Sequence, residues 1–243
     1  MEQNRISGSS FDGWQDAQGN PVAANPGYIA SYMTKVYGWM FLALCITAGL
    51  AYFTANTPFI LNIVLGTPFL FLGLIIGQLF LVGFLSIRIM KMSAMVATIV
   101  FFAYAALNGI TFSVILLRYT PGSLASVFAI TAGTFGIMTA LGYFTKTDLT
   151  SFGRLMIMGL VGIIIASIVN FFMRSETLYW IISYVGVAVF VGLIAYDTQK
   201  IKSYALLEHE EDRKKGAILG ALALYLDFIN LFIYLLRLFG NRR

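Results

Sequence analysis

Seven apolar stretches, each close to the roughly 20 residues that a helix needs to cross a bilayer, constrain this chain more than any other feature. They fall at about 36–56, 67–87, 93–117, 123–144, 154–173, 178–199 and 217–239. Lipid offers no hydrogen-bond partners to a backbone, and the stretches lack the alternating pattern of a barrel, so helices are the structure that they favour. The sequence therefore predicts an all-α integral membrane protein with seven transmembrane helices.

The amino-acid composition supports the membrane assignment. The 243 residues are 59% hydrophobic and only 11% charged, whereas a soluble domain is about 25% charged. The net charge of +5 comes from basic residues in the short links, where they set topology, so no nucleic-acid binding is expected. One cysteine and one histidine leave no material for a thiol metal cluster or histidine chemistry. With no nucleophile–base set visible either, neither an enzyme nor a cofactor is expected.

The chain divides into two parts. Residues 1–34 are polar and rich in Gly, Ser, Asn and Pro, and we expect them to form a flexible cytoplasmic tail. They lack the apolar run and cleavage site of a signal peptide. Residues 35–243 are the predicted transmembrane domain. With no organelle targeting sequence and a single cysteine, the chain suits a bacterial inner membrane.

The basic residues predict the orientation of the chain. If all seven stretches cross, eleven lysines and arginines lie on the side of the N-terminus and five on the other. The five are Arg118, Arg174, Arg237, Arg242 and Arg243. This excess places the N-terminus in the cytoplasm. The basic C-terminus would then lie outside, against the trend, which leaves open whether the last stretch crosses fully or dips in and returns.

Asp227 is the most costly residue of the predicted membrane domain, since it lies at the middle of the last apolar stretch. A carboxylate there costs about 2.5–3.5 kcal/mol, so it must face protein or water. Asp197, near the end of the sixth stretch, lies on the preceding antiparallel helix and is the favoured partner. Asn230 and Tyr234 share the helix face of Asp227 and are predicted supporting polar residues. Hydrogen bonds to such groups would instead make Asp227 a purely structural carboxyl.

Three motifs resemble those of the transmembrane Bax inhibitor motif family. The run LYLDFINLFIYLLRLFG at 224–240 looks like the family's C-terminal signature, and GLIAYDTQKIK at 192–202 is similar to its second signature. The stretch NGITFS at 108–113 matches a weaker third signature. The resemblance covers about residues 30–240. It implies six helices wrapped around a central C-terminal helix and a calcium leak tuned by pH. It also implies that Asp197 and Asp227 form a di-aspartyl sensor.

The resemblance further implies an arginine partner at the end of the second span. Arg88 is the best match, although the spacing to the motif at 108–113 would equally allow Lys91. At an effective dielectric constant of about 20, two carboxylates 4 Å apart repel by about 4 kcal/mol, so the pair is expected to share one proton. With the proton the carboxyls can clamp two helices. Without it they repel, one can move to Arg88, and both become oxygen ligands for transient calcium.

The leading prediction is a pH-sensitive calcium leak channel whose ligands are calcium ions and protons. The first alternative is a non-conducting membrane protein that modulates a quality-control protease or cell-death and stress factors, with the tail as its handle. Deleting residues 2–30 would separate the two, since lost regulation with intact flux supports the alternative. The second alternative is a proton-coupled transporter of a small solute, which predicts saturable uptake with stoichiometric proton movement.

Overall fold

The computed structural model describes residues 26–243, which form eight α-helices and no named strand. The helices are α1 (Pro26–Asn56), α2 (Pro58–Gly66), α3 (Pro68–Arg88), α4 (Ala94–Arg118), α5 (Pro121–Phe144), α6 (Thr150–Met173), α7 (Glu176–Tyr204) and α8 (Glu210–Phe239). All except α2 are long and apolar enough to cross a membrane. The predicted all-α fold with seven spans is thus confirmed, and the protein is a multi-pass membrane protein.

The helices begin and end where the sequence gives a local reason. Pro58 and Pro68 stand in the first turn of α2 and α3, where the missing N–H has no helical partner to lose. The hydroxyl of Ser93 accepts a hydrogen bond from the Val96 N–H and caps α4. A 3₁₀ turn, Ile89–Lys91, separates α3 from α4.

The first helix is longer than the sequence indicated. It begins at Pro26, so residues 26–34 of the predicted tail are helical. Tyr32 explains part of this difference, because it is 7% exposed and its hydroxyl donates to the Arg213 carbonyl at 3.0 Å. The remainder of the predicted tail, residues 1–25, lies outside the described residues.

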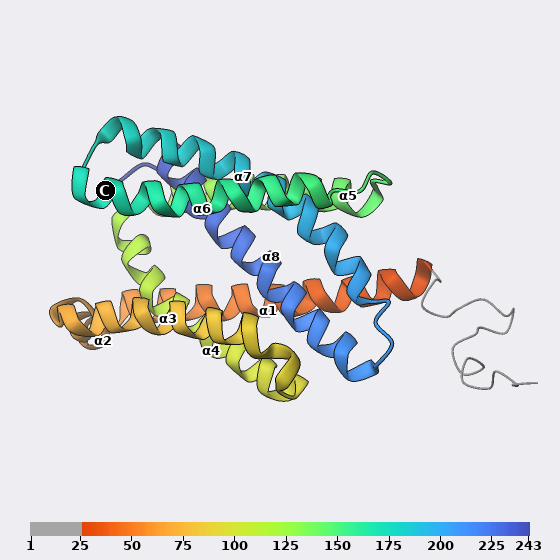
Figure 1. Cartoon of the computed structure of the whole chain (residues 1–243). Helices are drawn as coiled ribbons and strands as arrows, with labels where there is room; N and C mark the ends of the chain where they lie inside the picture. Colours follow the sequence, from red (N-terminus) through yellow and green to blue (C-terminus); the bar gives the residue numbers. More distant parts are fainter. Residues whose placement is uncertain (1–25) are drawn as a thin grey trace, which may run out of the picture.

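Helix α8 lies at the centre of the molecule (Figure 1). Its most apolar window is 67% buried, compared with 6% for the corresponding windows of α3 and α6. It packs mainly against α1, α4, α5 and α7, while α3 packs mainly on α4 and α6 mainly on α7. The predicted central C-terminal helix is confirmed. Of the six other spans, four surround it closely and two form an outer layer.

Two glycines bring α7 and α8 into close contact. A Cβ atom added to Gly220 would lie 2.8 Å from Ile201 Cγ1, and one added to Gly216 would lie 2.9 Å from Tyr204 Cβ. Small residues at such positions let two helices approach closely. As the residue numbers rise along α8 they fall along α7, so the two helices are antiparallel in register.

The last helix crosses the whole molecule. It is one unbroken helix of 30 residues, and the chain that follows it lies along the link between α4 and α5. There the Arg243 N–H donates to the Arg118 carbonyl at 2.9 Å, and the Thr120 N–H donates to the Asn241 carbonyl at 3.1 Å. This end is opposite to the start of α1 and to the α7–α8 link (Figure 1). The alternative in which the last stretch dips in and returns is therefore wrong.

One buried hydroxyl joins three helices at the core. Thr47 of α1 donates from Oγ1 to the Ala105 carbonyl of α4 at 2.9 Å. The same oxygen lies 2.7 Å from the hydroxyl of Tyr225 on α8. Since the single Thr47 proton is used on Ala105, the Tyr225 hydroxyl is the donor in the second bond.

We expect the substitution Thr47→Val to lower the free energy of unfolding by about 1–3 kcal/mol, because it leaves a buried Tyr225 hydroxyl without its partner. Thermal unfolding of the purified protein in detergent would measure this change. Thr34→Val is the matched control, since Thr34 is exposed on the same helix and its hydroxyl donates to the Ala30 carbonyl one turn back. Equal unfolding temperatures for both variants would contradict the expectation.

Candidate functional site

Asp227 lies in the middle of the membrane-spanning bundle. It comes seventeen residues after the first residue of α8 and twelve before the last. The residue is 4% exposed, and its Oδ2 atom is buried without a hydrogen-bond donor among the described residues. An ionised carboxylate in this position would leave a charged acceptor unsatisfied, which is costly in a membrane interior.

Asp197 brings a second carboxyl to the same place. The antiparallel register of α7 and α8 sets it beside Asp227, and the two carboxyls lie close enough to interact. Two ionised carboxylates have only acceptor atoms, so a hydrogen bond between them needs one proton. The structure therefore brings together the two acidic residues that the sequence singled out, in an arrangement that suits a shared proton.

Lys200 is the cation that acts on Asp197. It lies three residues further along α7, and its Nζ atom is 5.7 Å from the centre of the Tyr196 ring. Sequence reasoning overlooked this lysine. The spacing of three residues, which places two side chains on one face of a helix, is the signal that could have found it.

Arg88 does not lie at the carboxyl pair. Both Arg88 and Lys91 are exposed at the end of α3. Between them, the Met90 carbonyl accepts a bond of 3.4 Å from Lys215 Nζ of α8. Lys215 precedes Asp227 by twelve residues, or about 18 Å along a helix. In this arrangement neither predicted cation is the charged neighbour of either carboxyl.

Asn230 and Tyr234, which were predicted to support Asp227, contact other groups instead. The Asn230 side-chain amide donates to the Leu226 carbonyl of its own helix at 2.8 Å. The Tyr234 ring stacks on Phe190 at 5.8 Å between centroids. Neither residue hydrogen-bonds Asp227 within the described part of the chain. A shared helix face was insufficient because the amide finds a nearer acceptor one turn back in its own backbone.

Three buried hydroxyls from three helices meet inside the bundle. The hydroxyl of Tyr37 on α1 faces those of Thr139 on α5 and Thr198 on α7. All three oxygens are buried, and none has a well-formed hydrogen bond among the described residues. Thr198 directly follows Asp197 in α7, but neighbouring residues on a helix point in different directions. No sequence pattern predicts this hydroxyl cluster, because only the folded bundle brings the three positions together.

This architecture defines a multi-pass helical membrane protein with an acidic pair between its last two helices, of which Asp227 is buried and Asp197 half-buried. Residues 29–243 match the family model described as "Inhibitor of apoptosis-promoting Bax1". The chain belongs to this Bax inhibitor family, which confirms the resemblance drawn from the motifs.

Bacterial relatives support the family assignment. Inner membrane protein YbhL of Escherichia coli is 50% identical over 218 residues, which cover 88% of this chain and 93% of that protein. A protein of Borreliella burgdorferi is 46% identical over 214 residues, covering 87% of this chain and 92% of its own. A membrane protein of Streptococcus pyogenes is 34% identical over 213 residues, with shares of 86% and 92%.

Proposed function

We propose that the protein is a pH-sensitive calcium leak channel gated by Asp197 and Asp227. One observation carries the proposal: the two carboxyls adjoin at mid-bundle, and Asp227 Oδ2 has no donor among the described residues. The channel carries out no chemical conversion and needs no cofactor, since calcium is the permeant ion.

The gate follows from the charge states of the pair. With one shared proton, the carboxyls hydrogen-bond and hold α7 against α8 where the two helices are already close. Without the proton, two like charges remain in contact, with a repulsion of about 4 kcal/mol at 4 Å and an effective dielectric constant of about 20. That energy favours separation of the helices and opens a path, so the leak increases as the pH rises.

The carboxyl pair suits a passing cation. Calcium takes six to eight oxygen ligands, and the freed carboxylates of Asp197 and Asp227 supply some of them. Water can supply the remaining ligands. Such mixed, partly neutral ligation favours transient binding. Arg88, far from the closed pair, could receive a freed carboxylate only if α3 or α8 moved.

The cellular setting is part of the proposal. The YbhL relative is named as an inner membrane protein, and we place this chain in the same membrane. The lysine and arginine excess puts its N-terminus in the cytoplasm. Calcium would then enter at the end that carries the C-terminus.

Calcium flux into liposomes that contain the purified protein tests the proposal. We expect flux above that of protein-free liposomes, low at acidic pH and rising with pH, and a flat profile for Asp197→Asn. Absence of flux at every pH would favour the non-conducting interaction protein. Saturable uptake of a small solute with stoichiometric proton movement would favour a transporter instead.

A further inference from the structure

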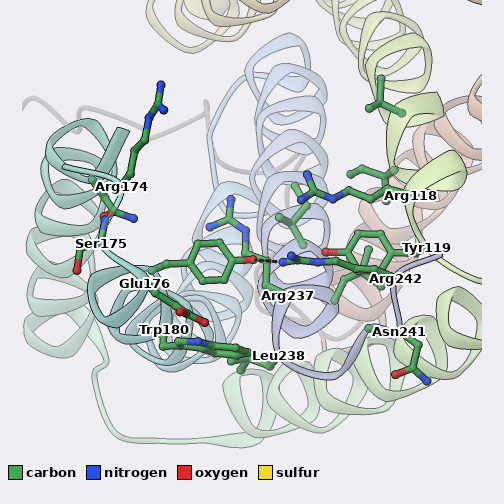
Figure 2. Close-up of a pocket in the computed structure, with 17 residues that line it drawn as sticks. Arg118, Tyr119, Arg174, Ser175, Glu176, Trp180, Arg237, Leu238, Asn241 and Arg242 are labelled. Carbon is green, nitrogen blue, oxygen red and sulfur yellow. Dashed lines mark hydrogen bonds between the residues drawn. The ribbon is translucent and has the colours of Figure 1, made fainter. Parts of the chain in front are cut away.

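A large cavity lies next to the C-terminal residues, and neither carboxyl of the pair lines it; Figure 2 shows its lining. Its volume is about 880 Å³, and it lies between the α4–α5 link, the α6–α7 link and the end of α8. Four arginines line it, together with a single acidic residue, Glu176. The arginines are Arg118, Arg174, Arg237 and Arg242.

Within the described part of the chain, no salt bridge joins a carboxylate to these arginines. The two salt bridges found in residues 26–243 join Lys214 to Glu210 and Lys215 to Asp212, at the opposite end of α8. Aromatic groups hold two of the four guanidiniums in the cavity instead. Arg237 lies 5.6 Å from the centre of the Tyr179 ring and 5.1 Å from that of Tyr234. Arg242 Nη2 donates to the Tyr179 hydroxyl at 3.2 Å.

The C-terminal segment fixes two of the arginines side by side. The Arg243 N–H donates to the Arg118 carbonyl, and the Asn241 N–H donates to Ser123 Oγ at 2.9 Å. These bonds hold Arg242 against the strand-like stretch at Tyr119. Figure 2 shows Arg118 and Arg242 next to each other at the cavity. The like charges are thus positioned by the backbone before any ligand arrives, which lowers the entropy cost of binding.

Membrane topology does not account for this cluster. The five basic residues on this side of the chain are all arginines, and four of them line the one cavity. In the proposed orientation this side faces away from the cytoplasm, whereas positive residues normally gather on the cytoplasmic side. The planar guanidinium fork matches oxyanions in two-point contacts, which the lysine ammonium cannot do.

We propose that this arginine cavity binds a phosphate-bearing anion, either a soluble phosphate or the headgroup of an anionic phospholipid. A carboxylate ligand with one charge would leave most of the positive charge uncompensated. A phosphate group offers several acceptor oxygens to more than one guanidinium at once. Trp180 and Leu238 add apolar surface to the lining, which suits the part of an amphiphile next to its phosphate. The proposal is independent of the calcium leak.

Binding to the purified protein in detergent tests this proposal. Calorimetric titration with inorganic phosphate probes the soluble source, and native mass spectrometry with phosphatidylglycerol against phosphatidylcholine probes the lipid source. Binding of phosphate supports the cavity as a solute site, and selective retention of phosphatidylglycerol supports it as a headgroup site. Binding of neither probe would overturn the proposal.

Two variants make the test specific. The double substitution Arg118→Gln with Arg242→Gln changes two exposed side chains and should weaken binding about tenfold or more, as expected from the loss of charge-assisted hydrogen bonds. Arg154→Gln removes a matched exposed arginine at the other end of α6, where it donates to Ser151 Oγ at 3.2 Å, and this variant should bind as the wild type does. Equal weakening in both proteins, or none in the double variant, would also overturn the proposal.

Discussion

Calcium leak through the Asp227→Asn protein is expected to be low and independent of pH, whereas the wild-type leak rises as the pH increases. An asparagine amide cannot lose its proton, and it can donate a hydrogen bond to the Asp197 carboxylate beside it. The substitution therefore imitates the proton-sharing pair and keeps α7 against α8. A repulsion of about 4 kcal/mol at 4 Å is no longer available to open the gate.

The largest difference is expected at alkaline pH, where the wild-type pair has lost its proton. Since each 1.4 kcal/mol changes an equilibrium tenfold, the variant should leak at least about tenfold less there. At acidic pH the two proteins should be equally closed. Calcium-sensitive dye trapped in liposomes, read over a series of external and internal pH values, measures both ends of the profile.

Asp148→Asn is the control for this experiment. Asp148 is an exposed carboxyl in the α5–α6 link, and its Oδ1 atom accepts a bond of 2.9 Å from the Thr150 N–H. Hydrogen bonds from Thr150 hold the pKa of Asp148 below its ordinary value. Since Asp148 stays ionised throughout the tested range, its removal should leave the pH profile unchanged. A wild-type profile in the Asp227→Asn protein would place the pH sensor elsewhere.

Most of the fold could be predicted because the bilayer sets a length and a composition that the sequence must meet. Each of the seven predicted stretches is a helix, and the breaks coincide with prolines and charged links. Helix α2 could not be predicted in this way, since its nine residues are too few to cross a membrane. The early start of α1 depends on contacts such as that of Tyr32 with Arg213, which join distant parts of the chain.

The site could be predicted only in part. The carboxyl pair could be predicted because a charge in the middle of a membrane helix is costly, which singles out Asp227. Its partner had to be another of the few polar residues in the spans, which favours Asp197. Arg88 was expected at the pair from the family resemblance, whereas in the structure it is exposed at the end of α3, two residues before the Met90 carbonyl that Lys215 contacts. The hydroxyl cluster of Tyr37, Thr139 and Thr198 and the arginine cavity both draw on separate helices. Their members carry no common sequence signal, so only the packing of the bundle reveals them.

The contact between α5 and α7 explains how Asp197 is held in place. Gly142 of α5 faces the backbone of Ala195, two residues before Asp197, and a Cβ atom on Gly142 would collide with the Ala195 carbonyl oxygen. Only a glycine permits this approach. The Lys202 ammonium closes the same contact by donating to the Tyr143 carbonyl at 2.7 Å. The position of one carboxyl of the pair therefore depends on a residue that has no side chain.

We expect Gly142→Leu to lower the free energy of unfolding by about 3 kcal/mol or more, because the backbone atoms that it would strike cannot rotate away. Gly136→Leu is the matched control on the same helix, where an added Cβ meets nothing within 4 Å. Fluorescence-detected size exclusion after heating would give the melting temperature of both variants. If the two variants had the same melting temperature, α5 and α7 would not be in backbone contact.

If the Gly142→Leu protein still folded at a lower temperature, its calcium leak should lose the wild-type pH profile, since a displaced α7 can no longer bring Asp197 to Asp227.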